Sequence, residues 1–409
     1  MEKNKTAATK KKKSYRIKNR WLHKAIWLAR PFVKLYLRIK YGYKTEKLKK
    51  IDGNYIIMSN HTMELDPVLC AVVSPHQIYF VCGEHLMTKP IWKTLNLVFN
   101  PIPKYKGDAD VGAIMEVMRR IRAGYNILLY PEGSRSFNGE TEQLEKAVGS
   151  LVKACKCNLI TYRMQGGYFC EPRWAYTVRK GNIKGHIQGI YTKEELAKLS
   201  DQDVTDIINH DLHENAYERQ LENPTPYKGK RLAEGLENYL ILCPRCGKID
   251  TLKTEDDKFC CEYCGMEGKY NEYGFLEGES LPYDSVYDWG QWEEKAFKEM
   301  MLAQDSGSAL LMDEDITLQE IAQDHTRINL TYGCLKCYQD RLEINDQTIS
   351  FRNITGMSML YYGKTLVFTS QKKHFNLTGE KYHAIKYQWL FDLYKEKKFE
   401  QNNESSRRG

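Results

Sequence analysis

The 409-residue chain has no stretch that approaches 18 uninterrupted apolar residues, and this argues against a conventional transmembrane helix. Its N-terminal region also lacks the apolar core of a secretion signal, because basic residues interrupt it at Lys24, Arg30, Lys34 and Arg38. Without such a signal, the twelve cysteines favour thiols or metal ligands in a reducing compartment over a disulfide framework. We therefore expect the protein on the cytosolic side of a cell.

Acidic residues are scarce at the start of the chain. Residues 1–50 contain 18 Lys or Arg against two acidic residues, a net charge of +16. The whole chain carries +8, so the other 359 residues carry −8. A short basic arm thus precedes an acidic body, whose length and 42% apolar content suggest two or three folded domains.

Residues 20–41 have the periodicity of an amphipathic helix, which Pro31 should kink or split. One stripe is apolar and consists of Trp21, Ala25, Leu28, Phe32, Leu35 and Ile39. Basic residues occupy a separate arc, and this division is typical of a helix lying in the interface of an anionic membrane. Two alternatives stay open: a helix packed on the protein's own core, and nucleic-acid binding by the lysine block 10–13.

A first motif with catalytic potential follows the predicted buried strand 56–58. It contains Asn60, His61 and, five positions after the histidine, Asp66. An imidazole can take a proton from a hydroxyl at neutral pH, and a carboxylate can hold its tautomer and stabilise the imidazolium. The two side chains can meet if His61 lies in the entry turn and Asp66 in the first turns of a helix.

A second motif follows another predicted strand, 127–130. Its sequence, Pro-Glu-Gly-Ser-Arg-Ser at 131–136, offers backbone N–H groups and a guanidinium to an anion. Between the two motifs, the turn 100–106 contributes Lys104 and Lys106. These features together predict a site where a general base lies beside an anion-binding loop.

The two motifs resemble those of the glycerolipid acyltransferases typified by 1-acyl-glycerol-3-phosphate acyltransferase. The family motif NHxxxxD matches Asn60, His61 and Asp66, and (F/Y)PEG(T/S)RS matches residues 130–136 without a gap. Two further motifs depart from the family pattern. Lys106 stands where the family has arginine, and Thr161 stands where it has proline. Order and spacing agree over about residues 20–220.

The resemblance implies an α/β fold, a glycerolipid acyltransferase-like sheet with flanking helices. It also implies O-acyl transfer from acyl-CoA or acyl-carrier protein to lysophosphatidic acid or a related lysophospholipid, giving phosphatidic acid. His61 would act as the base and Asp66 would orient it, without a catalytic cofactor. Arg135 and Lys106 would hold the acceptor's phosphate, with Lys104 a weaker candidate. Glu132, Gly133 and Ser134 would complete the substrate-binding loop, and the first two would shape it. Lysine at 106 keeps the charge but loses the bidentate fork, so the acceptor headgroup is open.

Two CxxC pairs, separated by 14 residues, predict a metal centre. They are Cys243 with Cys246 and Cys261 with Cys264. Four thiolates at this spacing are typical of a structural zinc ribbon with one Zn²⁺ per chain. A glycine follows each pair and permits the positive φ of a knuckle turn. Cys260 is an alternative ligand to its neighbour.

The C-terminal region predicts a mostly β domain. From about residue 325, seven short strand-like runs precede a helix at 381–398, an order that resembles a pleckstrin-homology-like barrel closed by a helix. The predicted organisation is a disordered basic arm (1–19), an interfacial helix with the acyltransferase domain (20–225), a zinc ribbon (238–275), a helical or irregular connector (276–324), the β domain (325–399) and a disordered tail (400–409).

These features predict a peripheral enzyme on the cytoplasmic face of the cell membrane, without a transmembrane span. Its expected partners are an anionic membrane surface, a lysophospholipid acceptor and an acyl donor. Nucleic acid is not an expected partner, because the body of the chain is acidic. The alternatives are a membrane-associated adaptor with a vestigial acyltransferase core, and an acyltransferase whose acceptor is not a glycerophosphate.

Overall fold

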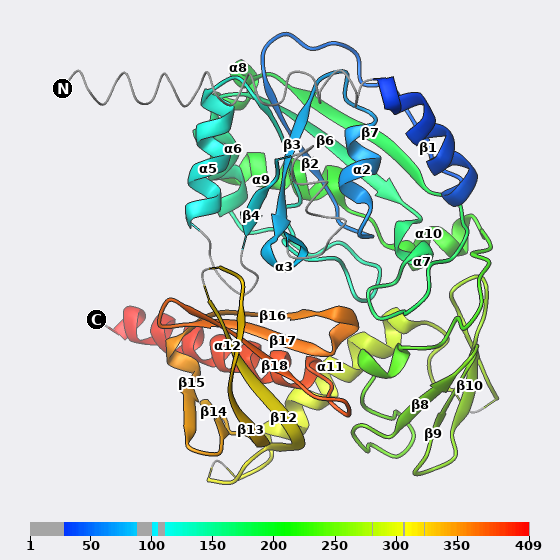
Figure 1. Cartoon of the computed structure of the whole chain (residues 1–409), viewed down its shortest axis with the longest axis vertical. Coiled ribbons are helices and arrows are strands. Elements are labelled where there is room, and N and C mark those ends of the chain that lie inside the picture. The colour runs from blue at the N-terminus through cyan, green and yellow to red at the C-terminus, as the bar shows by residue number, and fades with distance from the viewer. Residues whose placement is uncertain are drawn as a thin grey trace.

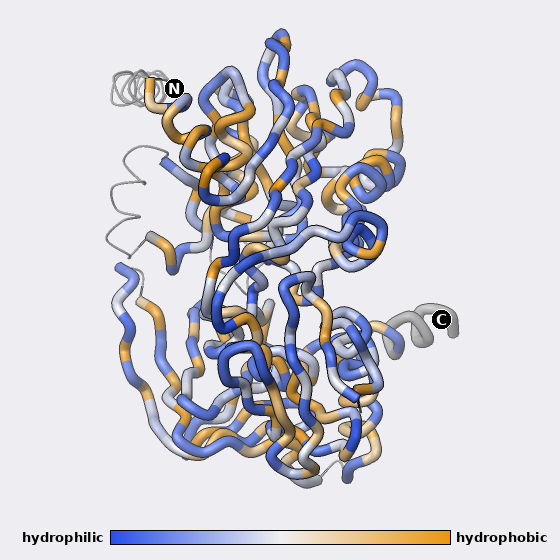
Figure 2. Tube along the Cα trace, turned by 90° about the vertical axis from the view of Figure 1, so that its right-hand side faces the viewer, coloured by the Kyte–Doolittle hydropathy of each residue, from blue (hydrophilic) through white to orange (hydrophobic). Residues whose placement is uncertain are grey.

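The computed structural model describes residues 28–87, 100–104, 111–279, 281–305, 307–322 and 324–408. These residues form three sheets (Figure 1). The first sheet and its helices make up the upper half of Figure 1, and the other two sheets lie side by side below it. Hydrophobic segments run through the interior of both halves, while hydrophilic segments dominate the outer loops (Figure 2).

The first sheet has seven strands in the order β1-β7-β6-β2-β5-β3-β4. Its pairings are parallel except between β6 and β7. The strands are β1 (Lys44–Thr45), β2 (Tyr55–Ser59), β3 (Ile78–Gly83), β4 (Ile102–Lys104), β5 (Asn126–Leu129), β6 (Asn158–Gln165) and β7 (Lys184–Tyr191). The helices between and after them are α2 (Asp66–Ala71), α3 (Glu84–Met87), α5 (Val111–Arg122), α6 (Ala147–Cys155), α7 (Gly167–Cys170), α8 (Lys193–Leu196), α9 (Asp201–Leu212) and α10 (Ala216–Glu222).

Both faces of this sheet are covered, which explains why its central strands read as unbroken apolar runs. In β2, Ile57 contributes to one core cluster, whereas Ile56 and Met58 contribute to the other. The α/β fold predicted from the sequence is confirmed.

A helix over 28–41 packs on the edge of this sheet and is continuous through Pro31 in the described residues. Leu37 and Tyr41 are buried in the core, and the Arg30 guanidinium donates to the Ser74 carbonyl at 2.5 Å. At 100° per residue, this buried face lies opposite the predicted apolar stripe. The stripe is accordingly exposed: Leu28 by 65%, Phe32 by 74%, Leu35 by 55% and Ile39 by 65%. Residues 1–27 lie outside the described part of the chain.

The second sheet contains the CxxC pairs. Its four antiparallel strands are β8 (Leu252–Glu255), β9 (Lys258–Cys261), β10 (Glu267–Tyr270) and β11 (Leu276–Glu277). Buried Arg179, from the loop before β7, packs on the Tyr270 ring at 4.7 Å and donates to its hydroxyl at 3.2 Å. This contact fixes the small sheet to the first one.

The third sheet has seven antiparallel strands in the order β15-β14-β13-β12-β18-β17-β16. The strands are β12 (Leu311–Ile321), β13 (Arg327–Cys337), β14 (Arg341–Ile344), β15 (Gln347–Ser350), β16 (Ile354–Leu360), β17 (Thr365–Ser370) and β18 (Lys373–Thr378). Helix α11 (Val286–Leu302) precedes them and α12 (Ile385–Arg408) follows. Antiparallel strands ending in a helix agree with the prediction for this region.

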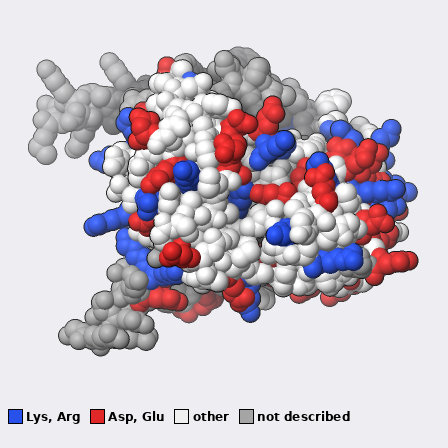
Figure 3. Space-filling view, turned by 90° about the horizontal axis from the view of Figure 1, so that it is seen from below, with Lys and Arg blue, Asp and Glu red and all other residues white. Residues whose placement is uncertain are grey.

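Acidic and basic side chains intermingle on the face of the molecule seen from below, so neither sign of charge dominates there (Figure 3).

One part of the prediction is wrong: the segment 276–324 is not only helical or irregular. It contains β12, which pairs with both β13 and β18 at the centre of the sheet. Three consecutive acidic residues, Asp313 to Asp315, interrupt the apolar alternation that identifies a strand. The alternation appears only later in the strand, where Ile316 and Leu318 are buried. The first two of the seven short runs predicted in this region are moreover one strand, β13 (Arg327–Cys337).

A buried lysine joins the second and third sheets. Lys386 in α12 pairs with Asp250, next to the CxxC region, at 2.5 Å and with Asp313 in β12 at 2.8 Å. Burial lowers the pKa of this lysine, but the two carboxylates outweigh it and raise the pKa above its usual value. The charged form therefore stabilises the contact between the two sheets.

Candidate active site and metal centre

Two loops at the carboxyl ends of neighbouring parallel strands build the candidate active site. The loop 60–65 leaves β2, and the loop 130–136 leaves β5, which pairs directly with β2. The Ser136 N–H donates to the His61 carbonyl at 3.3 Å and joins the loops. Open α/β sheets bind ligands at this end of their strands.

His61 and Asp66 meet as their spacing predicts. The His61 Nδ1 and Asp66 Oδ2 atoms lie 2.9 Å apart, with Asp66 fully buried and the histidine side chain 20% exposed. Asp66 is the first residue of α2, and its Oδ2 also accepts the N–H groups of Thr62 at 2.6 Å and Met63 at 2.9 Å. One carboxylate thus orders the loop and orients the imidazole.

Two neighbours hold the histidine in place. The Asn60 side chain donates to the Met164 carbonyl at 2.8 Å and accepts from the Met164 N–H at 2.7 Å, which ties the loop to β6. The Tyr130 ring stacks on the His61 ring with 4.3 Å between centroids. The loop that carries His61 is therefore fixed to β6, and one face of the imidazole ring packs on Tyr130.

Glu132, which the sequence predicts to shape the second loop, contacts the backbone of the histidine. Its Oε1 accepts the His61 backbone N–H at 2.8 Å, and its Oε2 accepts the Glu142 N–H at 3.3 Å. Burial raises the pKa of Glu132 to about 8. It does not line the cleft that contains His61 and Arg135, so these contacts favour a positioning role.

Arg135 projects into the cleft and already has anionic neighbours. Its guanidinium lies 3.3 Å from the Glu171 carboxylate and 4.0 Å from that of Glu64. Burial raises the pKa of Glu171 to about 7, although Arg135 opposes the shift. A ligand phosphate at Arg135 would therefore compete with Glu171 for the same guanidinium.

The other predicted phosphate ligands differ in where they lie. Gly133 lines the cleft with a φ of +73°, and a Cβ there would be 3.8 Å from the Lys104 ammonium. Ser134 belongs to the same loop but does not line the cleft. Lys106 lies outside the described residues, whereas its neighbour Lys104 lines the cleft.

The cleft has a volume of about 210 Å³ and two walls that belong to different sheets. The first wall carries His61, Lys104 and Arg135. The second consists of residues 359–362, from the end of β16 and the turn after it. Sequence reasoning missed this second wall and also Glu171, because no local motif marks residues that come together only in the folded chain.

The four predicted cysteines form a candidate metal centre. Their sulfurs all lie within 4.8 Å of one another, with Cys243 and Cys264 3.7 Å apart and Cys246 and Cys261 3.8 Å apart. Four sulfurs bound at about 2.3 Å in a tetrahedron are about 3.8 Å apart, so the group could hold a metal ion. Gly247 and Gly265 have φ values of +68° and +70°, as knuckle turns require. Cys260 is exposed and is not part of the group.

Comparisons with known proteins agree with the site. Residues 40–165, which include both motifs, match the family model Acyltransferase. The chain carries an acyltransferase domain. The prediction of an acyltransferase is confirmed for this domain, which contains the first-sheet strands from β1 to β6.

The comparisons with solved structures and with curated proteins gave different results. The chain is similar to the 1-acyl-sn-glycerophosphate (LPA) acyltransferase PlsC from Thermotoga maritima, with 18% identity and a TM-score of 0.38, covering 47% of this chain and 78% of that one. No curated protein matches the sequence. Among helices in the described part of the chain, none is long and apolar enough to span a bilayer.

Proposed function

We propose that this chain transfers a fatty acyl group from an acyl thioester, acyl-CoA or acyl-carrier protein, to the free hydroxyl of a lysophospholipid. One observation carries the proposal: His61, oriented by buried Asp66, shares a cleft with Arg135 and Lys104. A general base beside cations is the arrangement needed to activate a hydroxyl on a phosphate-bearing acceptor.

The contacts of His61 support a direct reaction without an acyl-enzyme. Because Nδ1 donates to Asp66, Nε2 is the nitrogen that takes the proton from the acceptor hydroxyl. The hydroxyl oxygen then attacks the thioester carbonyl, and the C–S bond breaks as the tetrahedral intermediate collapses. The leaving thiolate takes the proton back from the imidazolium, which Asp66 has stabilised meanwhile. Arg135 and Lys104 would hold the acceptor's phosphate.

The experiment that tests this function is an acyl-transfer assay on the purified full chain. Acyl-CoA and acyl-carrier protein are each offered with a panel of lysophospholipids, and the diacyl product is identified by mass spectrometry. His61-dependent product supports the proposal, whereas a chain inert with every pair of substrates contradicts it.

Glu132 gives a prediction about the support of the histidine. With a pKa of about 8, its carboxyl is mostly protonated at pH 7, and Glu132→Gln preserves an oxygen that accepts the His61 N–H. We therefore expect near-normal kcat for Glu132→Gln. Glu132→Ala leaves this N–H without its acceptor and should cost roughly 1–3 kcal/mol of stability together with a loss of kcat.

The pH dependence of folding stability should also differ between wild type and Glu132→Gln. The Glu132 pKa is higher in the folded chain than in an unfolded one, so folding binds this proton more tightly. Its contribution to stability is fully present at pH 4 and is lost as the pH rises to about 8. The fall in melting temperature over this range should be smaller for Glu132→Gln than for wild type. Equal falls would contradict a buried, protonated Glu132.

We also propose that the helix over 28–41 rests on the surface of an anionic membrane at the cytoplasmic face. The exposed stripe of Leu28, Phe32, Leu35 and Ile39 supports this proposal, because water-exposed apolar stripes mark surfaces that bind membranes or proteins. The basic charge of residues 1–50 would add attraction to anionic lipids.

The membrane proposal predicts the behaviour of a charged double variant. Phe32→Glu with Leu35→Glu should weaken binding to phosphatidylglycerol vesicles in a flotation assay by at least about 10-fold, because each change removes an apolar side chain from the lipid. Leu221→Glu, at a residue equally exposed at 69% on α10, serves as the control. Unchanged flotation of the double variant would contradict the proposal.

For the metal centre we propose one structural zinc ion per chain, held by the four thiolates. Four cysteine ligands leave no open coordination position for a substrate, so the ion would stabilise the second sheet rather than take part in acyl transfer.

A further inference from the structure

The second wall of the cleft contains an unusual turn of the backbone. Tyr361, Tyr362 and Gly363, between β16 and β17, have φ values of +48°, +63° and +88°. Bulky residues with positive φ cost of order 1–3 kcal/mol each, and they concentrate at functional sites where the surrounding structure enforces them. Two consecutive tyrosines in this conformation therefore require an explanation.

Contacts to the acyltransferase domain hold this turn in place. Arg173, fully buried in the domain, donates to the Met359 carbonyl at 2.8 Å and to the Arg135 carbonyl at 2.9 Å, so it links the turn to the second motif. From the domain, His85 meets the Tyr361 ring edge-on at 5.9 Å. Within the third sheet, Arg327 at the start of β13 donates to the Tyr361 hydroxyl at 3.1 Å.

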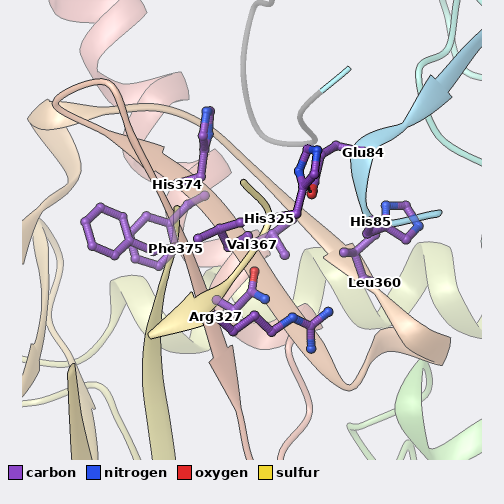
Figure 4. A pocket seen from close by; sticks show the side chains of 11 residues that line it. Glu84, His85, His325, Arg327, Leu360, Val367, His374 and Phe375 are labelled. Carbon is purple, nitrogen blue, oxygen red and sulfur yellow. Dashed lines mark ion pairs between the residues drawn. The ribbon is translucent and has the colours of Figure 1, made fainter. Parts of the chain in front are cut away.

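The contact between the domain and the third sheet extends beyond the turn. Glu84 at the start of α3 pairs with His325, which precedes β13, and His85 lies beside this pair on the domain side (Figure 4). The sheet therefore presents the turn to the catalytic cleft as a fixed wall.

Both tyrosines line the cleft that contains His61 and Arg135. The Tyr362 ring packs edge-on against Tyr176 at 5.2 Å. Burial raises the pKa of Tyr362, and the charges of Glu64 and Glu171 raise it further. The Tyr362 hydroxyl is thus close enough to Glu64 and Glu171, the two acidic neighbours of Arg135, to interact with them electrostatically.

The polar groups around Arg135 are unsuited to a bare phosphate monoester. A dianion on this arginine would lie beside the carboxyl groups of Glu64 and Glu171. Because like charges repel, it would bind only if these groups were displaced or protonated. A phosphodiester carries one negative charge. A hydroxyl or ammonium group on its far side could donate to Glu64, Glu171 or a tyrosine oxygen, which are acceptors.

We propose that Tyr361 and Tyr362, with Glu64 and Glu171, form a headgroup site that selects lysophospholipids whose phosphate is esterified to a hydroxyl- or amine-bearing headgroup. This inference rests on the proposed function and deepens it, because it assigns acceptor choice to the third sheet. Lysophosphatidic acid is then the poorer acceptor.

The test compares lysophosphatidylglycerol, lysophosphatidylethanolamine and lysophosphatidic acid as acceptors for wild type, Tyr362→Phe and Tyr362→Asn. Asparagine tolerates the positive φ at this position, so the fold should survive. Wild type should favour the two diesters in kcat/KM by about 10-fold, the effect of one well-placed hydrogen bond or charge contact. Tyr362→Asn should raise KM for the diesters about 10-fold and leave kcat and the lysophosphatidic acid KM within about 2-fold.

Two controls complete the experiment. Tyr273→Asn, in a turn of the second sheet and 38% exposed, should change none of these constants. Tyr362→Phe should keep part of the diester preference, because it retains the ring that packs on Tyr176.

Two results would overturn the inference while the proposed function stands: a wild type that prefers lysophosphatidic acid, or a Tyr362→Asn variant that shifts all three acceptors equally. If no acceptor is turned over, the function fails, and equilibrium binding of a short-chain lysophosphatidylglycerol decides the inference by itself. Weaker binding by Tyr362→Asn than by wild type supports the headgroup site, and equal binding overturns it.

Discussion

Replacing His61 with alanine should lower kcat for acyl transfer by about 10²- to 10⁴-fold, the usual contribution of a positioned general base. The Nδ1 atom of this histidine lies 2.9 Å from the Asp66 carboxylate, which prepares the other ring nitrogen to take a proton. KM for the acyl donor should change little, because the imidazole acts on the acceptor hydroxyl. Initial rates at saturating donor and acceptor measure the effect.

A surface histidine provides the matched control. His186, with a side chain 40% exposed, pairs with exposed Glu46 at 3.1 Å. It lies on β7 and does not line the cleft. His186→Ala should retain wild-type kcat, since exposed ion pairs contribute little to stability. A His61→Ala variant that folds normally and keeps wild-type kcat would refute the assigned base.

Loss of the metal centre should have the second large effect. Replacing Cys243 and Cys261 with serine should abolish zinc binding, which we expect at about one ion per chain in wild type. The sheet around these cysteines has four strands, three of them only four residues long and one of two residues. Apparent binding free energies of about 10–16 kcal/mol are typical of structural zinc, so this sheet should unfold without it.

The effect should reach the active site through Lys386. That buried lysine pairs with Asp250 beside the metal centre and with Asp313 in β12, and the third sheet supplies one wall of the cleft. We therefore expect the double serine variant to lose acyl transfer as well as stability. Metal content by mass spectrometry, melting temperature and kcat measure the three consequences.

Cys260→Ser controls for the loss of a thiol, because Cys260 is exposed and outside the group of four. It should retain zinc, melting temperature and activity. A double serine variant that keeps its metal, or one that loses the metal with no change in stability, would contradict a structural zinc site.

The parts of the active site that sequence could predict are those built from contiguous residues. His61 and Asp66 are five positions apart, and the turn into α2 brings them together without help from distant segments. The same holds for the CxxC pairs, whose knuckle glycines are adjacent to the ligands. Local geometry decides these contacts, so local sequence predicts them.

The parts that escaped prediction depend on segments far apart in the chain. Glu171 reaches Arg135 from 36 positions away, and the turn at Tyr361 reaches the cleft from about 300 positions beyond His61. The hydrophobic periodicity of a sequence does not predict contacts between such distant segments. The contact of Glu132 with the His61 backbone could not be predicted for a related reason, because a motif shows which residues are neighbours in sequence but not which way each carboxylate points.

The N-terminal helix illustrates a different limit. Its apolar stripe could be recognised from spacing, but the stripe alone does not say whether it faces the protein or the outside. Burial of Leu37 and Tyr41 on the opposite side, together with the Arg30 contact to the Ser74 carbonyl, decides this question. Arg30, a member of the predicted basic arc, thus anchors the helix to the protein.

The most direct test of the central claim is transfer of a labelled acyl chain from acyl-CoA or acyl-carrier protein to lysophospholipids, with wild type and His61→Ala measured side by side. Both proteins are matched for melting temperature and zinc content beforehand. The account predicts labelled diacyl product with wild type and a rate lower by at least about 10²-fold with His61→Ala. Equal rates, or two equally inert proteins across all donors and acceptors, would contradict it.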